Sequence, residues 1–152
     1  MKKIILSLFI FLTFSYSYTS EIKLVKVFDG LNKPWSLSFI DENNILVTEK
    51  SGNLLVVNLK ERTKSVIKHN LSILEDGQGG LLDVLFHNEN VYVSYSENRG
   101  NWHSSTSVAK GVFNYKFIDF KNIFRAEPPI NSGYHFGSRL VIKKDKLFIT
   151  AG

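Results

Sequence analysis

Three segments of this sequence repeat one pattern: an apolar triplet, a polar turn of about four residues, and a second triplet of strand-forming residues. Equivalent positions in the pattern, Leu46, Tyr92 and Phe148, are 46 and then 56 residues apart. Repeats of roughly 40–50 residues that each hold four short strands are typical of β-propeller blades. The sequence therefore predicts an all-β fold built from propeller blades, with a generic β-sandwich as the alternative, since a sandwich also has short strands and polar turns. The three segments read LSFIDENNILVTE, VLFHNENVYVSYS and LVIKKDKLFITAG.

The strands expected around these segments complete two blades and begin a third. No stretch shows sustained helical periodicity, which argues against an α/β fold. In the third segment, the apolar runs around Lys143–Lys146 predict a β-hairpin with four connecting residues. Trp35 follows Pro34 and is expected to anchor the core of the first blade. The expected strands are Ile22–Phe28, Trp35–Ile40, Ile45–Thr48, Leu54–Leu59, Lys64–His69, Leu81–Phe86, Val91–Ser96, Ser107–Tyr115, Ile118–Phe124, Leu140–Ile142 and Leu147–Ile149.

Two blades and the start of a third cannot close a ring, because propellers typically contain about four to eight blades. The last apolar strand runs into Gly152 without a closing turn, and such an exposed edge is rare in natural chains. We therefore expect residues 21–152 to be the truncated N-terminal part of a propeller domain, about two to two and a half blades. The alternative is a ring that closes by association with other copies.

The first 20 residues have the pattern of a secretory signal peptide. Lys2 and Lys3 form a positively charged start, Ile4–Phe14 is almost wholly apolar, and Ser15 and Ser17 are small residues near a plausible cleavage site. The apolar stretch is shorter than the roughly 18–20 residues that a membrane span needs. We therefore predict a periplasmic or secreted protein without a stable membrane anchor, with an uncleaved anchor as the alternative.

Charge and cysteine content exclude several classes of partner and scaffold. The formal net charge is +5, and without Lys2 and Lys3 the chain carries 17 basic and 14 acidic residues. This mild, scattered excess does not predict nucleic-acid binding. The absence of cysteine excludes a disulfide framework and a lipid-modified cysteine.

Two glycine-rich loops precede inner strands and hold the candidate site residues, Gln78 and His135. Loops that enter the innermost strands of a propeller meet at one mouth of the central channel, so both side chains are expected to face one pocket. Neighbouring glycines let the backbone approach a ligand, and the Gln78 amide offers both a donor and an acceptor. Neutral imidazole accepts a proton near neutral pH, which makes His135 the candidate general base. The competing interpretations are a tight turn for the first loop and an inert surface histidine for the second.

No metal site is predicted from the residues themselves. His69, His87 and His103 have no neighbouring ligands in the sequence, and no acidic calcium-binding loop is present. The sequence also lacks a GxSxG elbow, a Walker loop and a dinucleotide-binding fingerprint.

Four ordered motifs nevertheless resemble the glucose/sorbosone dehydrogenase family. They span about residues 24 to 152, and they are most similar to the soluble aldose sugar dehydrogenases of that family. The motifs are Pro34–Leu37 with Leu46–Glu49, Gly77–Val84, Val91–Glu97 and His135–Leu140.

The resemblance implies an exported six-bladed propeller that uses pyrroloquinoline quinone (PQQ) and calcium to oxidise aldose sugars to lactones. It implies that His135 takes the proton of the anomeric hydroxyl and that Gln78 lines the substrate and cofactor pocket. In the family, a carboxylate that supports the histidine follows the Thr-x-Gly found here at Thr150–Gly152, and most cofactor-binding residues belong to later blades. The 152 residues alone are therefore expected to be inactive.

Two hypotheses from different classes follow from these observations. The first is an exported PQQ-dependent aldose sugar dehydrogenase whose electron acceptor is unknown. The second is a non-catalytic extracellular propeller that binds other proteins, or an inactive remnant, because the supporting carboxylate and most of the cofactor site are missing from these residues.

Overall fold

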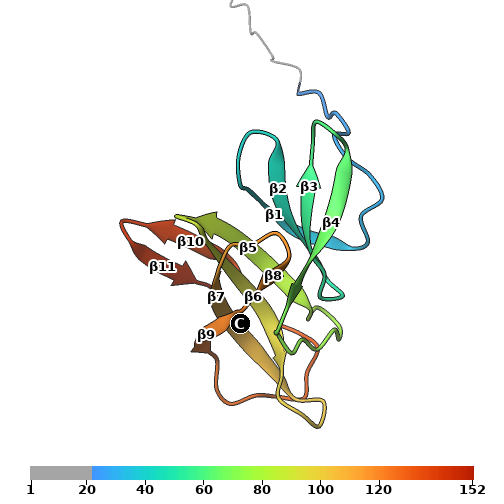
Figure 1. Ribbon diagram of the computed structural model, residues 1–152. Helices are drawn as coiled ribbons and strands as arrows, with labels where there is room; N and C mark the ends of the chain where they lie inside the picture. Colours follow the sequence, from blue (N-terminus) through green and yellow to red (C-terminus); the bar gives the residue numbers. More distant parts are fainter. Residues whose placement is uncertain (1–21) are drawn as a thin grey trace, which may run out of the picture.

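The computed structural model describes residues 22–152, which contain strands and no helix (Figure 1). The expectation of an all-β chain is confirmed, whereas the predicted signal peptide, residues 1–20, lies outside the described residues. The strands are β1 (Pro34–Phe39), β2 (Asn44–Glu49), β3 (Leu54–Asn58), β4 (Thr63–His69), β5 (Leu81–His87), β6 (Asn90–Asn98), β7 (Ser104–Val112), β8 (Phe117–Ile118), β9 (Lys121–Arg125), β10 (Leu140–Lys143) and β11 (Lys146–Ile149).

The first blade is the antiparallel sheet β1-β2-β3-β4, in which consecutive strands pair through short turns. The β1–β2 turn forms because the Asp41 carboxylate accepts hydrogen bonds from the backbone N–H groups of Asn43 and Asn44, at 2.8 and 2.9 Å. The Asn44 side-chain amide, followed by the Asn43 backbone bond, lowers the pKa of Asp41.

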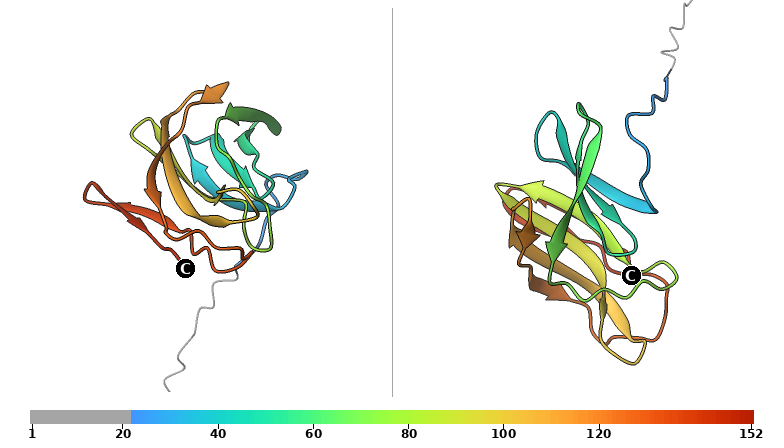
Figure 2. Two further views of the ribbon diagram at one scale, coloured as in Figure 1. Left: turned by 90° about the horizontal axis from the view of Figure 1, so that it is seen from below. Right: turned by 45° about the vertical axis from the view of Figure 1, so that its right-hand side comes forward.

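The second blade is the antiparallel sheet β5-β6-β7-β9, and the hairpin β10-β11 begins a third unit. Seen from below, the two sheets and the hairpin lie as successive sectors (Figure 2). β1 contacts β5, and β10 contacts both β5 and β6. The inner strand of each unit thus lies beside the inner strand of the next, which is the arrangement predicted for propeller blades.

The main core lies between the two blades. It combines apolar side chains from β2, β3 and β4 with side chains from β5, β6 and β7. Ile118 and Phe120, in the segment between β7 and β9, complete this core. A second, smaller cluster covers the other face of the first blade and packs beneath Phe28 and Leu31. Because strand side chains alternate between faces, β2 and β3 supply both clusters.

Several details differ from the sequence predictions. Residues Ile22–Phe28 do not form the predicted strand, because no strand within residues 22–152 pairs with them, and their apolar side chains are mostly exposed. Trp35 does not anchor the core: it lies on the face of the first blade opposite the second blade and is 44% exposed. Ser107–Tyr115 was expected as a strand, but β7 starts and ends three residues earlier, and Ile118–Phe124 divides into β8 and β9.

The strand β8 has a role that the sequence did not predict. It leaves the second blade and pairs in parallel with β4 of the first blade, at Lys68↔Phe117 and His69↔Ile118. The amide of Asn70 adds to this connection, since its Nδ2 donates to Asp119 and its Oδ1 accepts from the Phe120 backbone. The two blades are therefore fastened at their outer edges as well as through the core.

The hairpin of the third unit is tighter than predicted. Lys143 pairs with Lys146, so only Lys144 and Asp145 connect the strands, and both have positive φ angles of 49° and 58°. This is the two-residue turn whose twist matches that of paired strands. The β5–β6 hairpin has a turn of the same kind, in which Asn88 and Glu89 have φ angles of 48° and 59°.

Candidate functional site

The Gln78 loop is a turn held between the two blades. Gly79 N–H donates to Asp76 O at 2.6 Å, and Gly77 has a φ of 49°, which favours glycine. Lys50, just after β2, fixes the loop from the first blade: its backbone O accepts from Leu81 N–H at 3.1 Å, and its Nζ donates to Gly77 O. The loop can therefore present Gln78, whose side chain is exposed, at a defined position.

The His135 loop lies directly against the Gln78 loop. Gln78 N–H donates to Gly133 O at 2.6 Å, and the Gln78 side-chain Oε1 accepts from His135 N–H at 3.0 Å. A side chain at Gly77 or Gly133 would collide with the backbone of the other loop, so two glycines are needed for this contact. The structure thus brings the two predicted site residues together, at the shared end of β5 and β10.

The imidazole of His135 is exposed, and its ring centroid lies 6.4 Å from that of Tyr134. A cavity of about 50 Å³ lies beside it, lined by Tyr134, Phe136 and the start of β7. Gly152 packs against the His135 backbone with no room for a Cβ atom. Within residues 22–152, no carboxylate forms a hydrogen bond with the His135 ring. An exposed imidazole beside an amide can accept a proton from, or donate a hydrogen bond to, a ligand hydroxyl.

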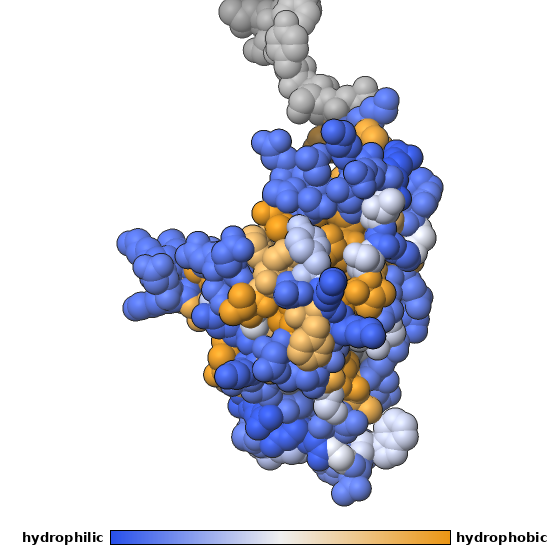
Figure 3. Space-filling model, viewed as in Figure 1, coloured by the Kyte–Doolittle hydropathy of each residue, from blue (hydrophilic) through white to orange (hydrophobic). Residues whose placement is uncertain are grey.

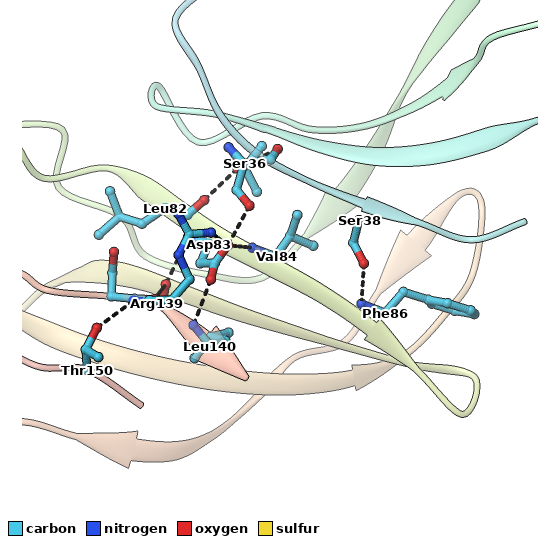
Figure 4. A network of polar contacts seen from close by, with 12 residues as sticks. Ser36, Ser38, Leu82, Asp83, Val84, Phe86, Arg139, Leu140 and Thr150 are labelled. Atoms are coloured by element: carbon cyan, nitrogen blue, oxygen red, sulfur yellow. Dashed lines mark hydrogen bonds and ion pairs between the residues drawn. The ribbon is translucent and has the colours of Figure 1, made fainter. Parts of the chain in front are cut away.

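A buried carboxylate, Asp83, joins the inner strands near this site (Figure 4). Its Oδ1 accepts from Ser36 Oγ at 2.5 Å and from Arg139 Nη1 at 3.1 Å, while Oδ2 accepts from Leu140 N–H at 2.7 Å. β5 has a register irregularity between Leu81 and Val84, and such bulges re-aim side chains. Asp83 therefore connects β1, β5 and the start of β10.

The importance of Asp83 was not predicted from the sequence, where it stands out only as the one charged residue in an otherwise apolar strand. That was the available signal, because a carboxylate is almost never fully buried unless it is paired. The structure identifies its partners, which come from segments 47 and 56 residues away. No sequence pattern indicates that Ser36 and Arg139 meet at one carboxylate.

A second polar cluster lies in the outer part of the second blade. Glu97 accepts hydrogen bonds from Arg125 through both of its oxygens, at 2.7 and 2.8 Å, and from Ser107 Oγ at 2.7 Å. The hydrogen bonds to Glu97 and its charge raise the pKa of Arg125. Burial and then the Glu97 charge raise the pKa of Tyr95 to about 12. These contacts tie β6, β7 and β9 together.

The remaining histidines are separate from the site. His69 Nε2 lies 2.8 Å from Gly52 O, and the His69 ring packs edge-on against Phe120. His103 Nδ1 lies 2.9 Å from Asn101 O in the β6–β7 turn. In the part of the chain that the structure describes, no three histidine, aspartate or glutamate side chains are grouped as metal ligands. The same residues include no helix long and apolar enough to cross a membrane.

Comparisons with known proteins agree with this architecture. The sequence model of the Glucose / Sorbosone dehydrogenase family matches residues 31–152. Aldose sugar dehydrogenase YliI of Escherichia coli (strain K12) is 33% identical over 134 residues, which cover 82% of this chain and 36% of that protein. The chain thus spans little more than a third of the length of this curated relative.

Solved structures show the same fold. A structure described as a glucose dehydrogenase superposes with a TM-score of 0.79 at 32% identity, covering 84% of this chain and 43% of the other. A PQQ-bound aldose sugar dehydrogenase from Streptomyces coelicolor superposes with a TM-score of 0.72 at 22% identity, covering 85% and 40%. The predicted β-propeller fold is confirmed, for the part of those propellers that this chain covers. Because the family model matches most of the sequence, the chain belongs to the glucose/sorbosone dehydrogenase family.

Proposed function

We propose that the protein is an exported, PQQ-dependent aldose sugar dehydrogenase that oxidises the anomeric hydroxyl of sugars to lactones, with His135 as the general base. The observation that carries this proposal is the hydrogen bond from the His135 backbone N–H to Gln78 Oε1, which joins two residues with exposed side chains. The family and the sugar dehydrogenase relative support the reaction class. The PQQ-bound structural neighbour supports the choice of cofactor.

His135 is suited to remove a proton from a sugar hydroxyl. Its side chain is exposed, so a hydroxyl can reach a ring nitrogen within about 2.6–3.2 Å, the range that proton transfer requires. Removing the proton from the anomeric oxygen allows a C=O bond to form there as the C1 hydrogen leaves as hydride. The bound quinone would supply the acceptor for that hydride.

Gln78 would hold the ligand against the imidazole. Its Oε1 is used by the His135 backbone, which fixes the orientation of the amide, and within residues 22–152 its Nε2 makes no hydrogen bond. The two N–H donors of Nε2 are thus available to a sugar oxygen or a quinone oxygen at the mouth. Gln78 would therefore both position His135 and contact the ligand.

The residues present fit contacts to a sugar and a quinone but offer no set of calcium ligands. An amide and an imidazole at an open mouth are suited to hydrogen bonding with ring oxygens. Calcium takes six to eight oxygen ligands, and residues 22–152 hold no cluster of acidic side chains that would begin such a set. We therefore assign no calcium contact to this chain's residues.

The test uses the protein expressed in full from its gene, reconstituted with PQQ and calcium and assayed by aldose-dependent dye reduction. The variant His135→Gln is expected to lower kcat by about 10²–10⁴-fold, because it removes the base. His87→Gln is the matched control, since His87 lies at the opposite end of β5, and it is expected to leave kcat unchanged.

Three outcomes separate the hypotheses. Full activity in His135→Gln would refute the role of His135 as the base. Absence of quinone binding in the natural protein, measured by titration of the quinone absorbance, would instead favour the non-catalytic binding module. Export is tested by N-terminal sequencing of the mature protein, which is expected to begin near residue 21, and an intact Met1 would contradict it.

A further inference from the structure

We propose that Thr106, Ser94 and Asp83 are positioning residues that set the place and direction of the His135 imidazole. This inference rests on the proposed role of His135 as the base. The three side chains come from neighbouring strands of the second blade, β7, β6 and β5, and they bind the backbone of the segment that carries His135 into β10.

The contacts form a ladder along residues 136–140. Thr106 Oγ1 donates to Phe136 O at 2.6 Å, and Ser94 Oγ donates to Ser138 O at 2.6 Å. Asp83 Oδ2 then accepts from Leu140 N–H at 2.7 Å. Every second residue of the segment is thus held by one buried side chain, and Gln78 holds His135 N–H at the free end.

The side chains of the ladder are buried, which restricts their motion. Ser94 is fully buried, and Thr106 and Asp83 are each 3% exposed. Ser94 Oγ also accepts from the backbone N–H of Asp83 at 2.9 Å, which joins the Ser94 hydroxyl to the strand that carries Asp83. Buried hydroxyls and carboxylates must keep their partners, because losing one leaves the other unsatisfied.

The segment needs such support because its own conformation is strained. His135 and Ser138 have φ angles of 63° and 82°, values that residues other than glycine rarely adopt. Strain of this kind persists only where the surroundings fix it, and it gathers at functional sites. Residue 135 is exposed, and within residues 22–152 no side chain forms a hydrogen bond with its ring, so these residues act on the ring through the backbone that the ladder holds.

The alternative is a purely structural role, in which the ladder attaches the third unit to the second blade and does not set the position of the His135 imidazole. Ser107 provides the matched control for that alternative. It is fully buried, neighbours Thr106 on β7, and donates from Oγ to Glu97 at 2.7 Å, away from the His135 segment. Ser107→Ala removes the same kind of bond from the same blade without touching the ladder.

The first measurement is steady-state kinetics of the natural, reconstituted protein. Thr106→Val and Ser94→Ala are each expected to lower kcat by about 10–100-fold with KM changed by less than about threefold, since a displacement of about 1 Å can cost 10²-fold in rate. Thr106→Ser retains the hydroxyl and should restore kcat to within about threefold of the natural value. Ser107→Ala should lower only the melting temperature.

The second measurement needs no quinone. Amide hydrogen exchange of the natural and variant proteins, followed by NMR, is expected to be about tenfold faster at His135 in Thr106→Val and Ser94→Ala, while amides of the β6–β7 pairing stay within about threefold. A uniform acceleration equal to that of Ser107→Ala would overturn the proposal. If Ser94→Ala does not fold, the Thr106 pair decides, because Val and Ser at that position differ in the hydroxyl.

The two proposals fail in different ways. If His135→Gln stays active, His135 is not the base and the proposed function is refuted. If His135→Gln is inactive but Thr106→Val and Ser94→Ala resemble Ser107→Ala in both kcat and exchange, the proposed function stands and the positioning role is refuted.

Discussion

The two blades differ in what fills their buried positions. In the first blade, β2 and β3 bury mainly leucine, isoleucine and valine side chains. In the second blade, β6 and β7 bury a row of hydroxyl groups and one carboxylate among their apolar residues. These polar residues are Ser94, Ser96, Glu97, Ser104, Ser105, Thr106 and Ser107.

This difference indicates a division of roles between the blades. Apolar packing is non-directional, so the leucine, isoleucine and valine side chains of the first blade stabilise the sheet without themselves fixing the direction of a loop. Hydrogen bonds are directional, and the buried hydroxyls of the second blade hold the two site loops: Ser96 Oγ accepts from Gly80 N–H at 2.7 Å and donates to Leu74 O at 2.6 Å, and Ser94 holds Ser138. In the view of Figure 3, the central part of the molecular surface is apolar and is bordered by polar regions.

The largest stability effect is expected in the first blade. Leu54 is fully buried in the core between the blades, and Leu54→Ala should lower the free energy of unfolding by about 2–5 kcal/mol, because it removes apolar contacts and leaves a cavity. Urea denaturation measures the change. Leu24→Ala is the control and should have almost no effect, since Leu24 is 94% exposed. A smaller loss for Leu54→Ala than for Ser94→Ala would contradict the comparison.

An intermediate effect is expected for the outer polar cluster of the second blade. Glu97→Gln should lower the free energy of unfolding by about 1–3 kcal/mol, because Arg125 and Ser107 lose hydrogen bonds to a charged partner. The Arg125 side chain is 51% exposed and can turn to water, which keeps the loss at this level. Thermal unfolding measures it.

Glu127→Gln is the matched control for Glu97→Gln. Glu127 pairs with Arg99 at 2.8 Å, but its side chain is 56% exposed, and exposed pairs contribute about 0–1 kcal/mol. Equal losses for the two variants would show that burial of Glu97 contributes nothing, and the contrast between the blades would then be weakened.

The smallest effect at neutral pH belongs to Tyr95, whose pKa is raised from 10.0 to about 12, chiefly by burial. The folded state therefore retains the phenol proton more strongly than the unfolded state. Stability is unaffected below about pH 10 and falls as the pH rises towards about 12, by up to about 1.4 kcal/mol per pH unit. Unfolding of the natural protein and of Tyr95→Phe at about pH 9 and 11 tests this, and an equal alkaline loss in both would contradict it.

The repeated strand–turn–strand pattern was sufficient to predict most strands and the blade architecture. That prediction worked because alternating apolar residues and turn residues act locally, within one hairpin. Ile22–Phe28 was predicted as a strand on the same grounds and was wrong, because a strand also needs a partner with matching hydrogen bonds. The prediction that Trp35 anchors the core of the first blade was also wrong, because the pattern does not indicate which face of a sheet a neighbouring blade covers.

For the site, the sequence predicted which residues carry chemistry. Gln78 and His135 stand out because each is a polar residue in a glycine-rich loop. Such a loop can be identified in the sequence without knowing its tertiary contacts. The tertiary structure alone decided that the two loops touch and that Asp83, Ser94 and Thr106 hold the His135 segment. The physical reason is distance along the chain: these bonds join residues 30 to 57 positions apart, and only the stacking of one blade on the next brings such residues within hydrogen-bonding reach.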